Sequence, residues 1–275
     1  MNIVLNYLLI YTFSLGVKGA AVATLISYAA ASIIMVIVWR RKELLAFKEL
    51  KIDGRIMKEA WDISLPAALT NTTSCLGHIV FASLVSSMGT VLFAAHSIAL
   101  SAETIFYVPG YGLRGATQTM IGISVGEKNR NLFIEIEKET MALTIIMMTI
   151  TGTLLYFSAE AVMSFFSPDM TVIEEGTRIL RLIAFTEPLF GIMIAAEGIY
   201  YGLGETKYPF IIETLGAWGI RILFSTILIK AFDATLSGVW MCMAADNTFR
   251  ALGLAFPILC KRGTKLFEEK TLTLK

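Results

Sequence analysis

The chain has 275 residues, of which 56% are apolar and only 16% are charged, and its formal net charge is +1. This balance lies outside the range of ordinary soluble domains and is typical of polytopic membrane proteins. A total charge close to zero indicates no nucleic-acid partner, so the positions of the charges carry the information.

The first apolar stretch, residues 3–13, is too short to cross a bilayer, which takes about 20 residues in a helix. No basic segment precedes it and no small-residue cleavage site follows it, so it does not resemble a signal peptide. We interpret it as the second half of a helix. We therefore expect the chain to be a fragment, or an N-terminally truncated copy, of a longer protein.

Seven later runs are mostly apolar and long enough to span a membrane. They lack the strict alternation of membrane barrels, and their internal Gly, Ser, Thr and Pro are typical of packed membrane helices. The fold class predicted is an all-α, polytopic helical membrane protein. We expect about seven transmembrane helices, at about residues 17–39, 63–87, 90–124, 140–167, 177–203, 208–231 and 236–260.

Basic residues gather in alternate connections between the predicted spans. The connections after the first, third and fifth spans and the tail hold most of them, whereas SSMGT and SPDMTVIEEG hold none. Basic connections stay on the cytoplasmic side of a membrane. We therefore expect a multi-pass protein of the cell (plasma) membrane with a cytoplasmic C-terminus.

Residues 41–58 carry mixed charges and form the predicted linker. Two interpretations stay open, namely an amphipathic helix at the cytoplasmic surface and a solvated charged loop. The linker separates residues 1–40, about a helix and a half, from residues 59–262, a compact group of six helices. Residues 263–275 are predicted to be a cytoplasmic tail.

Ionisable side chains inside the predicted spans are costly and usually face a protein interior or a water-filled cavity. Asp246 and Arg250 are four residues apart, about one helical turn, so we predict a structural ion pair on one helix face. Glu213 and Arg221 lie on the preceding span and are expected to pair with neighbouring helices.

Glu103 lies near the middle of its predicted span, and no cation is three or four positions away. A carboxylate buried without a counter-charge takes up a proton. Two interpretations are equally open, an ion-coupling residue that carries a proton and a hydrogen-bonded structural acid. Pro109, further along the same span, is predicted to kink the helix.

Glu187 precedes Pro188, and Glu197 lies about three turns further along the same predicted span. A proline inside a helix bends it and frees the carbonyl group four residues earlier as an acceptor. Glu187 and Glu197 are therefore further ion-coupling candidates. The alternative is a helix kinked at Pro188 that carries a hydrogen-bonded acid.

A polar cluster of Asn71, Thr72 and Thr73 follows a proline in the second full span. These side chains suit either substrate contacts or hydrogen bonds between helices. Tyr107 and Phe190 complete the candidate residues of a substrate cavity.

Motifs for nucleotide binding, dinucleotide binding or zinc hydrolysis are not present, so we expect no cofactor and no enzyme activity. The two histidines are isolated, and the cysteines lack metal-ligand spacing. The sequence therefore predicts no metal site, and we expect all three cysteines to be small buried residues (Cys75, Cys242 and Cys260).

Short segments follow one another along the chain in a distinctive order: GAAVATLIS from Gly19, SLP from Ser64, AAHSIA from Ala94, YVPG from Tyr107, ATQT from Ala116, VGE from Val125, YGLGETKYP from Tyr201 and GVW from Gly238. In this order and spacing they resemble the multidrug and toxic compound extrusion (MATE) transporter family over nearly the whole chain.

The resemblance implies a secondary antiporter with twelve helices in two six-helix lobes. It would exchange H⁺ or Na⁺ for bulky, often cationic, drug-like organic compounds. The chain would then be the C-terminal lobe with the last helix and a half of the N-terminal lobe, the rest of which is missing.

Two positions depart from the family pattern. Many members carry an acid in the seventh helix, where this chain has Thr72 and Thr73, and another in the tenth helix, at the position of Phe190. Coupling would then depend on an acid of the missing lobe or on Glu103.

Two other functions are weighed against efflux. A lipid-linked oligosaccharide flippase of the related superfamily would favour a more basic cavity. A membrane enzyme would need clustered catalytic groups, which helical spacing does not provide here, while a non-transporting assembly subunit is harder to exclude.

Overall fold

The computed structural model describes residues 1–41, 53–232 and 234–273. The chain divides into two compact units, Met1–Met57 and Lys58–Lys275. Most of the predicted linker, residues 42–52, lies outside the described ranges. Its described end is already helical, because α3 (Gly54–Ser86) begins there.

The first unit contains the short helix α1 (Asn2–Tyr7), the π-helical segment η1 (Leu8–Thr12) and the long helix α2 (Gly16–Arg41). A Cβ atom at Gly19 would lie 2.7 Å from the carbonyl oxygen of Leu9, so glycine lets α2 pass close to η1. Within its own unit α2 buries only Gly19 and Ala23, which leaves most of its apolar surface exposed.

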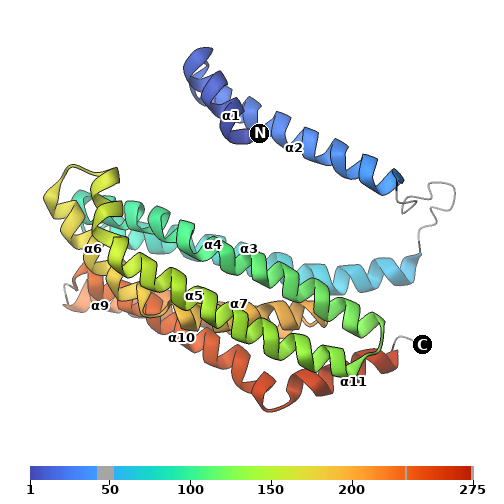
Figure 1. Ribbon diagram of the computed structural model, residues 1–275. Coiled ribbons are helices and arrows are strands. Elements are labelled where there is room, and N and C mark those ends of the chain that lie inside the picture. The colour runs from blue at the N-terminus through green and yellow to red at the C-terminus, as the bar shows by residue number, and fades with distance from the viewer. Residues whose placement is uncertain (42–52, 233, 274–275) are drawn as a thin grey trace. The chain divides into compact units, whose positions relative to one another are not determined.

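The second unit is a bundle in which α4, α5 and α7 run side by side (Figure 1). Its helices follow the rest of α3 as α4 (Thr90–Gly126), α5 (Arg130–Phe166), α6 (Met170–Ala184), α7 (Glu187–Gly202), α8 (Lys207–Thr214), η3 (Leu215–Ile222), α9 (Leu223–Phe232), α10 (Leu236–Leu259) and α11 (Arg262–Thr273). The segments α8, the π-helical η3 and α9 follow one another without a break.

Side-chain caps start three of these helices. Asn129 accepts a hydrogen bond from the Leu132 N–H at the start of α5, and Asp169 and Thr235 do the same for α6 and α10. Such caps satisfy N–H groups that have no partner within the helix. Because Asn129 caps it, α5 begins at Arg130, earlier than the predicted span at 140.

Five helices of the described ranges are long and apolar enough to cross a membrane, or six if α6 and α7 form one broken span. All seven predicted spans have a helical counterpart, and one of these falls short in apolar character. The difference is α10, a 24-residue helix that carries Asp246, Asn247 and Arg250. These side chains lower the mean hydropathy of α10 below that of a helix whose whole surface faces lipid.

The single helix predicted over 177–203 is wrong. The chain forms α6 and α7 instead, which meet at an angle of 54° across a short break. Pro188 lies in the first turn of α7, where its missing N–H would have no helical partner in any case. Pro188 therefore begins a helix and does not kink one, whereas Pro109 lies inside the uninterrupted α4.

Two hydrophobic clusters hold the bundle together. One contains Trp240, Leu155 and Ile179, and the other contains Phe133, Tyr200 and Leu254. Along α10 the first cluster ends at Met243 and the second begins at Ala251. Polar residues of α10 therefore lie between two apolar ends.

The expectation of three buried cysteines is wrong for two of them. Cys242 is buried, but Cys75 and Cys260 are exposed. Cys75 lies on an outward side of α3, and Cys260 follows the last residue of α10.

The predicted tail forms the helix α11, which packs against the ends of α4, α5 and α10. Phe267 is buried, and its ring centroid lies 4.9 Å from that of Phe133. Arg130 and Glu268 form an exposed ion pair at 3.2 Å. The C-terminal residues are thus part of the second hydrophobic cluster.

We expect the substitution Phe267→Ala to lower the free energy of unfolding by about 3 kcal/mol or more, because it leaves a cavity beside Phe133. Leu272 of the same helix is 69% exposed, so Leu272→Ala serves as the matched control and should have little effect. Thermal unfolding of the purified chain in detergent measures both. Equal losses of stability in the two variants would contradict the packing of α11.

Candidate functional site

A cavity of about 200 Å³ lies inside the second unit, among α3, α4, α7, α8, η3 and α10. Its walls hold three carboxylates and three guanidinium groups, so charge interactions decide what it can accommodate. Its polar and aromatic lining comprises Asn71, Ser74, His78, Glu103, Tyr107, Tyr111, Arg114, Phe190, Glu197, Glu213, Arg221, Asn247 and Arg250.

Asp246 lies behind this wall, fully buried, and binds two arginines. Arg221 reaches its Oδ2 atom at 2.7 Å, and Nε of Arg250 lies 2.8 Å from its Oδ1 atom. Both arginines also donate hydrogen bonds to the side-chain oxygen of Asn247, at 3.3 Å and 2.8 Å. We call Arg221, Asp246 and Arg250 the charged triad.

The π-helical segment η3 makes room for the charged triad. A Cβ atom at Gly216 would overlap Oδ1 of Asp246 and would lie 2.8 Å from Cγ of Arg250. Only glycine leaves this space free for a buried carboxylate and its partners. The sequence prediction of an Asp246–Arg250 pair on one helix face agrees with this geometry, but Arg221 comes from another element.

A second ion pair joins α4 to α7. Nη1 of Arg114 lies 2.8 Å from Oε2 of Glu197, and the carboxylate is buried. The guanidinium carbon of Arg114 also lies 4.8 Å from the ring centroid of Tyr111. Glu197, an ion-coupling candidate from the sequence, is thus already bound to a cation.

Glu103 and Glu213 line the cavity differently. Glu103 is only 7% exposed, and among the described residues it has neither a hydrogen bond nor an ion pair. Glu213 accepts one long hydrogen bond, at 3.4 Å, from the hydroxyl of Tyr201. Among the described residues, these two are the carboxylates of the lining that no arginine binds directly.

Three aromatic rings form one wall. The ring centroids of Tyr107 and Tyr111 lie 5.5 Å apart, and Phe190 lies 5.7 Å from Tyr107 and 6.2 Å from Tyr111. Such rings offer their faces to flat or cationic groups. The predicted cavity residues Tyr107 and Phe190 are thus brought together, and Asn71 of α3 also belongs to the lining.

Several predicted residues lie outside this lining. Thr72 and Thr73 donate hydrogen bonds to carbonyl oxygens of their own helix, those of Ala68 and Leu69, and do not reach the cavity. Glu187 is buried beside Gly152, and its Oε2 atom has no hydrogen-bond partner. Of the ion-coupling candidates, only Glu103 and Glu197 line the cavity.

The sequence interpretation did not select Tyr111 and Arg114 for the cavity. Together with Glu103 and Tyr107 they occur at intervals of four, four and three residues on α4. This spacing places side chains on one face of a helix. The spacing of these four residues is therefore the signal in the sequence that indicates their common position in the cavity wall.

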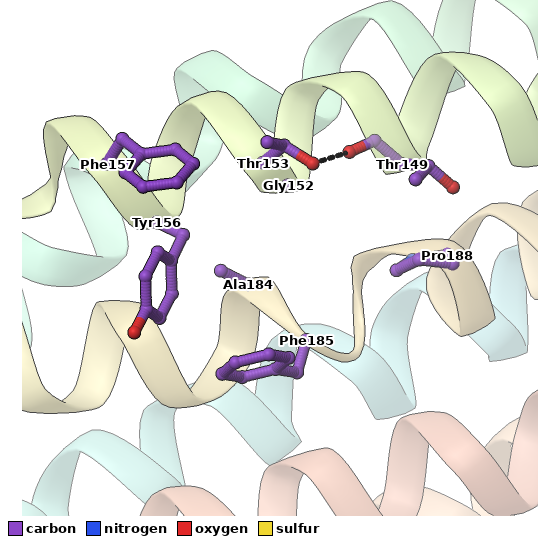
Figure 2. Close-up of a pocket in the computed structure, with 8 residues that line it drawn as sticks. All are labelled: Thr149, Gly152, Thr153, Tyr156, Phe157, Ala184, Phe185 and Pro188. Atoms are coloured by element: carbon purple, nitrogen blue, oxygen red, sulfur yellow. Dashed lines mark hydrogen bonds between the residues drawn. The ribbon is translucent and has the colours of Figure 1, made fainter.

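A second pocket, of about 400 Å³, lies beside the break between α6 and α7. Figure 2 shows Tyr156 of α5 and Phe185 of the break next to each other in its wall. Their ring centroids are 5.3 Å apart. The threonine hydroxyls of its wall bond to carbonyl oxygens of their own helix, so this pocket is apolar in character.

No group of three or more His, Cys, Asp or Glu residues that could hold a metal ion occurs in the described ranges. Two buried acids of the site, Asp246 and Glu197, have arginines as partners.

Comparisons with known proteins place this site in context. The MatE family model matches residues 66–227. The probable multidrug resistance protein NorM of Thermotoga maritima is 26% identical over 257 residues, which cover 91% of this chain and 55% of that protein. The chain therefore spans about half the length of this curated relative.

Solved structures share the fold. A MOP superfamily transporter from Pyrococcus furiosus superposes with a TM-score of 0.86 at 21% identity, over 96% of this chain and 60% of that one. The eukaryotic MATE transporter AtDTX14 gives a TM-score of 0.86 at 18% identity, over 100% of this chain and 62% of that one. The chain is thus a polytopic helical membrane protein, as predicted.

We expect Gly216→Ala to destabilise the second unit by about 1–3 kcal/mol, because the new methyl group displaces the Asp246 carboxylate. Gly219 lies in the same π-helical segment with no atom near its Cβ position, so Gly219→Ala is the matched control. The control should be neutral or slightly more stable, since alanine favours helices. Thermal unfolding compares them, and a neutral Gly216→Ala variant would be evidence against the tight fit.

Proposed function

The chain belongs to the MatE family, and from this premise we propose that its full-length protein is a secondary active antiporter. It exports bulky, often cationic, organic compounds in exchange for H⁺ or Na⁺. We further propose that this chain supplies the C-terminal six-helix lobe, residues 59–262. The length of the match suits one lobe, because the chain spans little more than half of its relatives. The assignment to the C-terminal lobe itself is supported by the segments that resemble the seventh to twelfth helices of the family.

The observation that carries the proposal is a buried carboxylate in the wall of the cavity, without an ion pair among the described residues. Glu103 is buried and lines the cavity, and it forms no ion pair with any residue that the structure describes. A buried carboxylate is costly unless a cation or a proton joins it. Binding of a cation or proton removes this cost, and its release restores it. A transporter can therefore couple cation binding to a change in the relative free energies of its conformations.

Charge and shape favour a cationic aromatic substrate. The cavity and the residue behind it hold four acids, Glu103, Glu197, Glu213 and Asp246, against the three arginines of the lining. The excess of acids disfavours the flippase alternative, for which a more basic cavity was expected. The rings of Tyr107, Tyr111 and Phe190 supply a face for stacking.

The membrane setting follows the same premise. We propose a location in the plasma membrane with the C-terminus in the cytoplasm, on the strength of the basic residues in alternate connections. A basic pair, Arg40 and Arg41, ends α2, in keeping with a cytoplasmic end for that helix.

We expect Glu103→Gln to abolish or strongly reduce coupled efflux, because glutamine keeps the shape but cannot exchange a proton or bind Na⁺ as a charged ligand. The measurement is ethidium efflux from cells that express the full-length protein, with pH and Na⁺ varied separately. Glu174→Gln, at an exposed position of α6, is the matched control and should transport normally. Unchanged efflux by Glu103→Gln at equal expression would overturn the role of this residue.

A further inference from the structure

The pocket beside the break between α6 and α7 opens on a side of the bundle that suits lipid. Its α5 wall belongs to a helix that is long and apolar enough to cross a membrane. Two rings of the lining, Phe157 and Phe185, are 77% and 73% exposed, and Ile150 and Leu154 are exposed on the same stretch of α5. Large exposed apolar side chains of a membrane-spanning helix belong in the hydrocarbon layer. The pocket is therefore open to the acyl chains of a bilayer.

Small residues at the break make room for the pocket. Gly152 of α5 and Ala184 of α6 are the buried members of its lining, and a Cβ atom at Gly152 would lie 2.8 Å from the Ala184 carbonyl oxygen. The two segments touch there, and the larger side chains around this contact enclose about 400 Å³ (Figure 2). Small-molecule sites have volumes of about 300–1,000 Å³. The size and the apolar lining of the pocket suit a hydrocarbon chain.

Two opposite charges lie one helical turn from the pocket. Glu160 follows Tyr156 by four residues on α5, and Arg181 of α6 precedes Phe185 by four residues. Nη2 of Arg181 lies 3.5 Å from Oε2 of Glu160, and its guanidinium carbon lies 5.7 Å from the ring centroid of Tyr156. Because Tyr156 and Phe185 line the pocket, this ion pair stands at one end of it.

The ion pair leaves binding capacity on both partners. The side chains of Arg181 and Glu160 are 43% and 69% exposed, and an exposed ion pair contributes little stability. The Nε–H group of Arg181 has no hydrogen-bond partner among the described residues, so Glu160 does not satisfy the whole guanidinium group. Arg178 and Glu175, at 3.2 Å, form a separate pair on α6. One cation and one carboxylate are thus presented together beside the pocket.

The position of the pair along α5 corresponds to the depth of lipid headgroups. With 37 residues α5 is about 55 Å long, whereas the hydrocarbon layer of a bilayer is about 30 Å thick. A centred helix therefore leaves about 12 Å at each end outside the hydrocarbon. Glu160 lies about 9 Å from the end of α5 at Phe166, and the pocket begins deeper along the helix. A lipid whose headgroup lies at the pair has its acyl chains at the level of the pocket.

We propose that the pocket and the Arg181–Glu160 pair form a binding site for a phospholipid with an ethanolamine headgroup. Its phosphate accepts hydrogen bonds from Arg181, its ammonium group donates to Glu160, and one acyl chain lies in the pocket. The acids Asp169 and Glu174 at the start of α6 disfavour a purely anionic headgroup. A choline headgroup has no N–H donor for the carboxylate of Glu160. The zwitterionic headgroup with a primary ammonium group therefore complements the site best.

This site goes beyond the proposed function. The linings of the pocket and of the charged cavity have no described residue in common, so the lipid and a transported compound would occupy separate places. The acyl chain fills the hollow beside the point where α6 and α7 meet at 54°. The inference stands whether or not the full-length protein exports organic compounds.

The test uses the full chain in phosphatidylcholine vesicles that contain a small amount of phosphatidylethanolamine with a diazirine in its acyl chain. Illumination attaches this lipid to the residues next to it, and mass spectrometry of peptides locates the label. We expect label in residues 149–157 and 184–188. Unlabelled phosphatidylethanolamine should remove most of it, whereas the same amount of phosphatidylglycerol should not. Equal competition by the two lipids, or label in neither segment, would overturn the proposal.

A pair of variants tests the role of the pocket. Thr153→Trp places a large ring in the lining and should remove most of the label from both segments. Leu154→Trp adds the same ring at the neighbouring position, which is exposed but outside the lining, and should leave the label unchanged. Soluble glycerophosphoethanolamine has the headgroup without acyl chains and should not compete. Equal labelling of the two variants, or competition by the soluble headgroup, would contradict a site that holds an acyl chain.

Three further variants test the headgroup contacts. Arg181→Gln removes the cation for the phosphate and should lower the label about tenfold or more. Arg178→Gln, in the separate ion pair of α6, is the matched control and should keep the label. In Glu160→Gln the preference should shift, so that phosphatidylglycerol competes at least as well as phosphatidylethanolamine. An unchanged preference in Glu160→Gln would overturn the assignment of the headgroup, and the wild-type competition decides the proposal even if a variant does not fold.

Discussion

The bundle depends on a carboxylate that two arginines hold inside it. Removing ions from water costs several kcal/mol each, and a buried pair survives only when geometry and additional hydrogen bonds offset that cost. Asp246 meets these conditions through Arg221, Arg250 and the amide of Asn247. The glycine at 216 and the wider π-helical turn around it make space for this group.

This constraint explains the layered core. Along α4 and α10 the apolar contacts gather near the two ends, and the charged and aromatic groups occupy the level between them. The apolar ends supply the packing that keeps the polar level in register. The polar level in turn prevents the bundle from closing into a uniform apolar core, so a cavity lined by charged and aromatic side chains persists.

Particular residues show how far sequence alone could go. The helical class followed from long apolar runs, and the Asp246–Arg250 contact followed from a spacing of four within one helix. Arg221 and the Arg114–Glu197 pair join separate helices, so no local spacing could reveal them. The break before Glu187 cannot be predicted from hydropathy, because the apolar composition continues across it. Hydropathy does not indicate the direction of a helix axis, which changes by 54° at this break.

The position of α11 after the other helices of the bundle has a consequence for the timing of folding. Phe267 completes the cluster of Phe133 and Tyr200, and it follows both of them in the chain. Chains fold from the N-terminus onward while they are made. This end of the bundle therefore stays open until α4, α5, α7 and α10 have all been made.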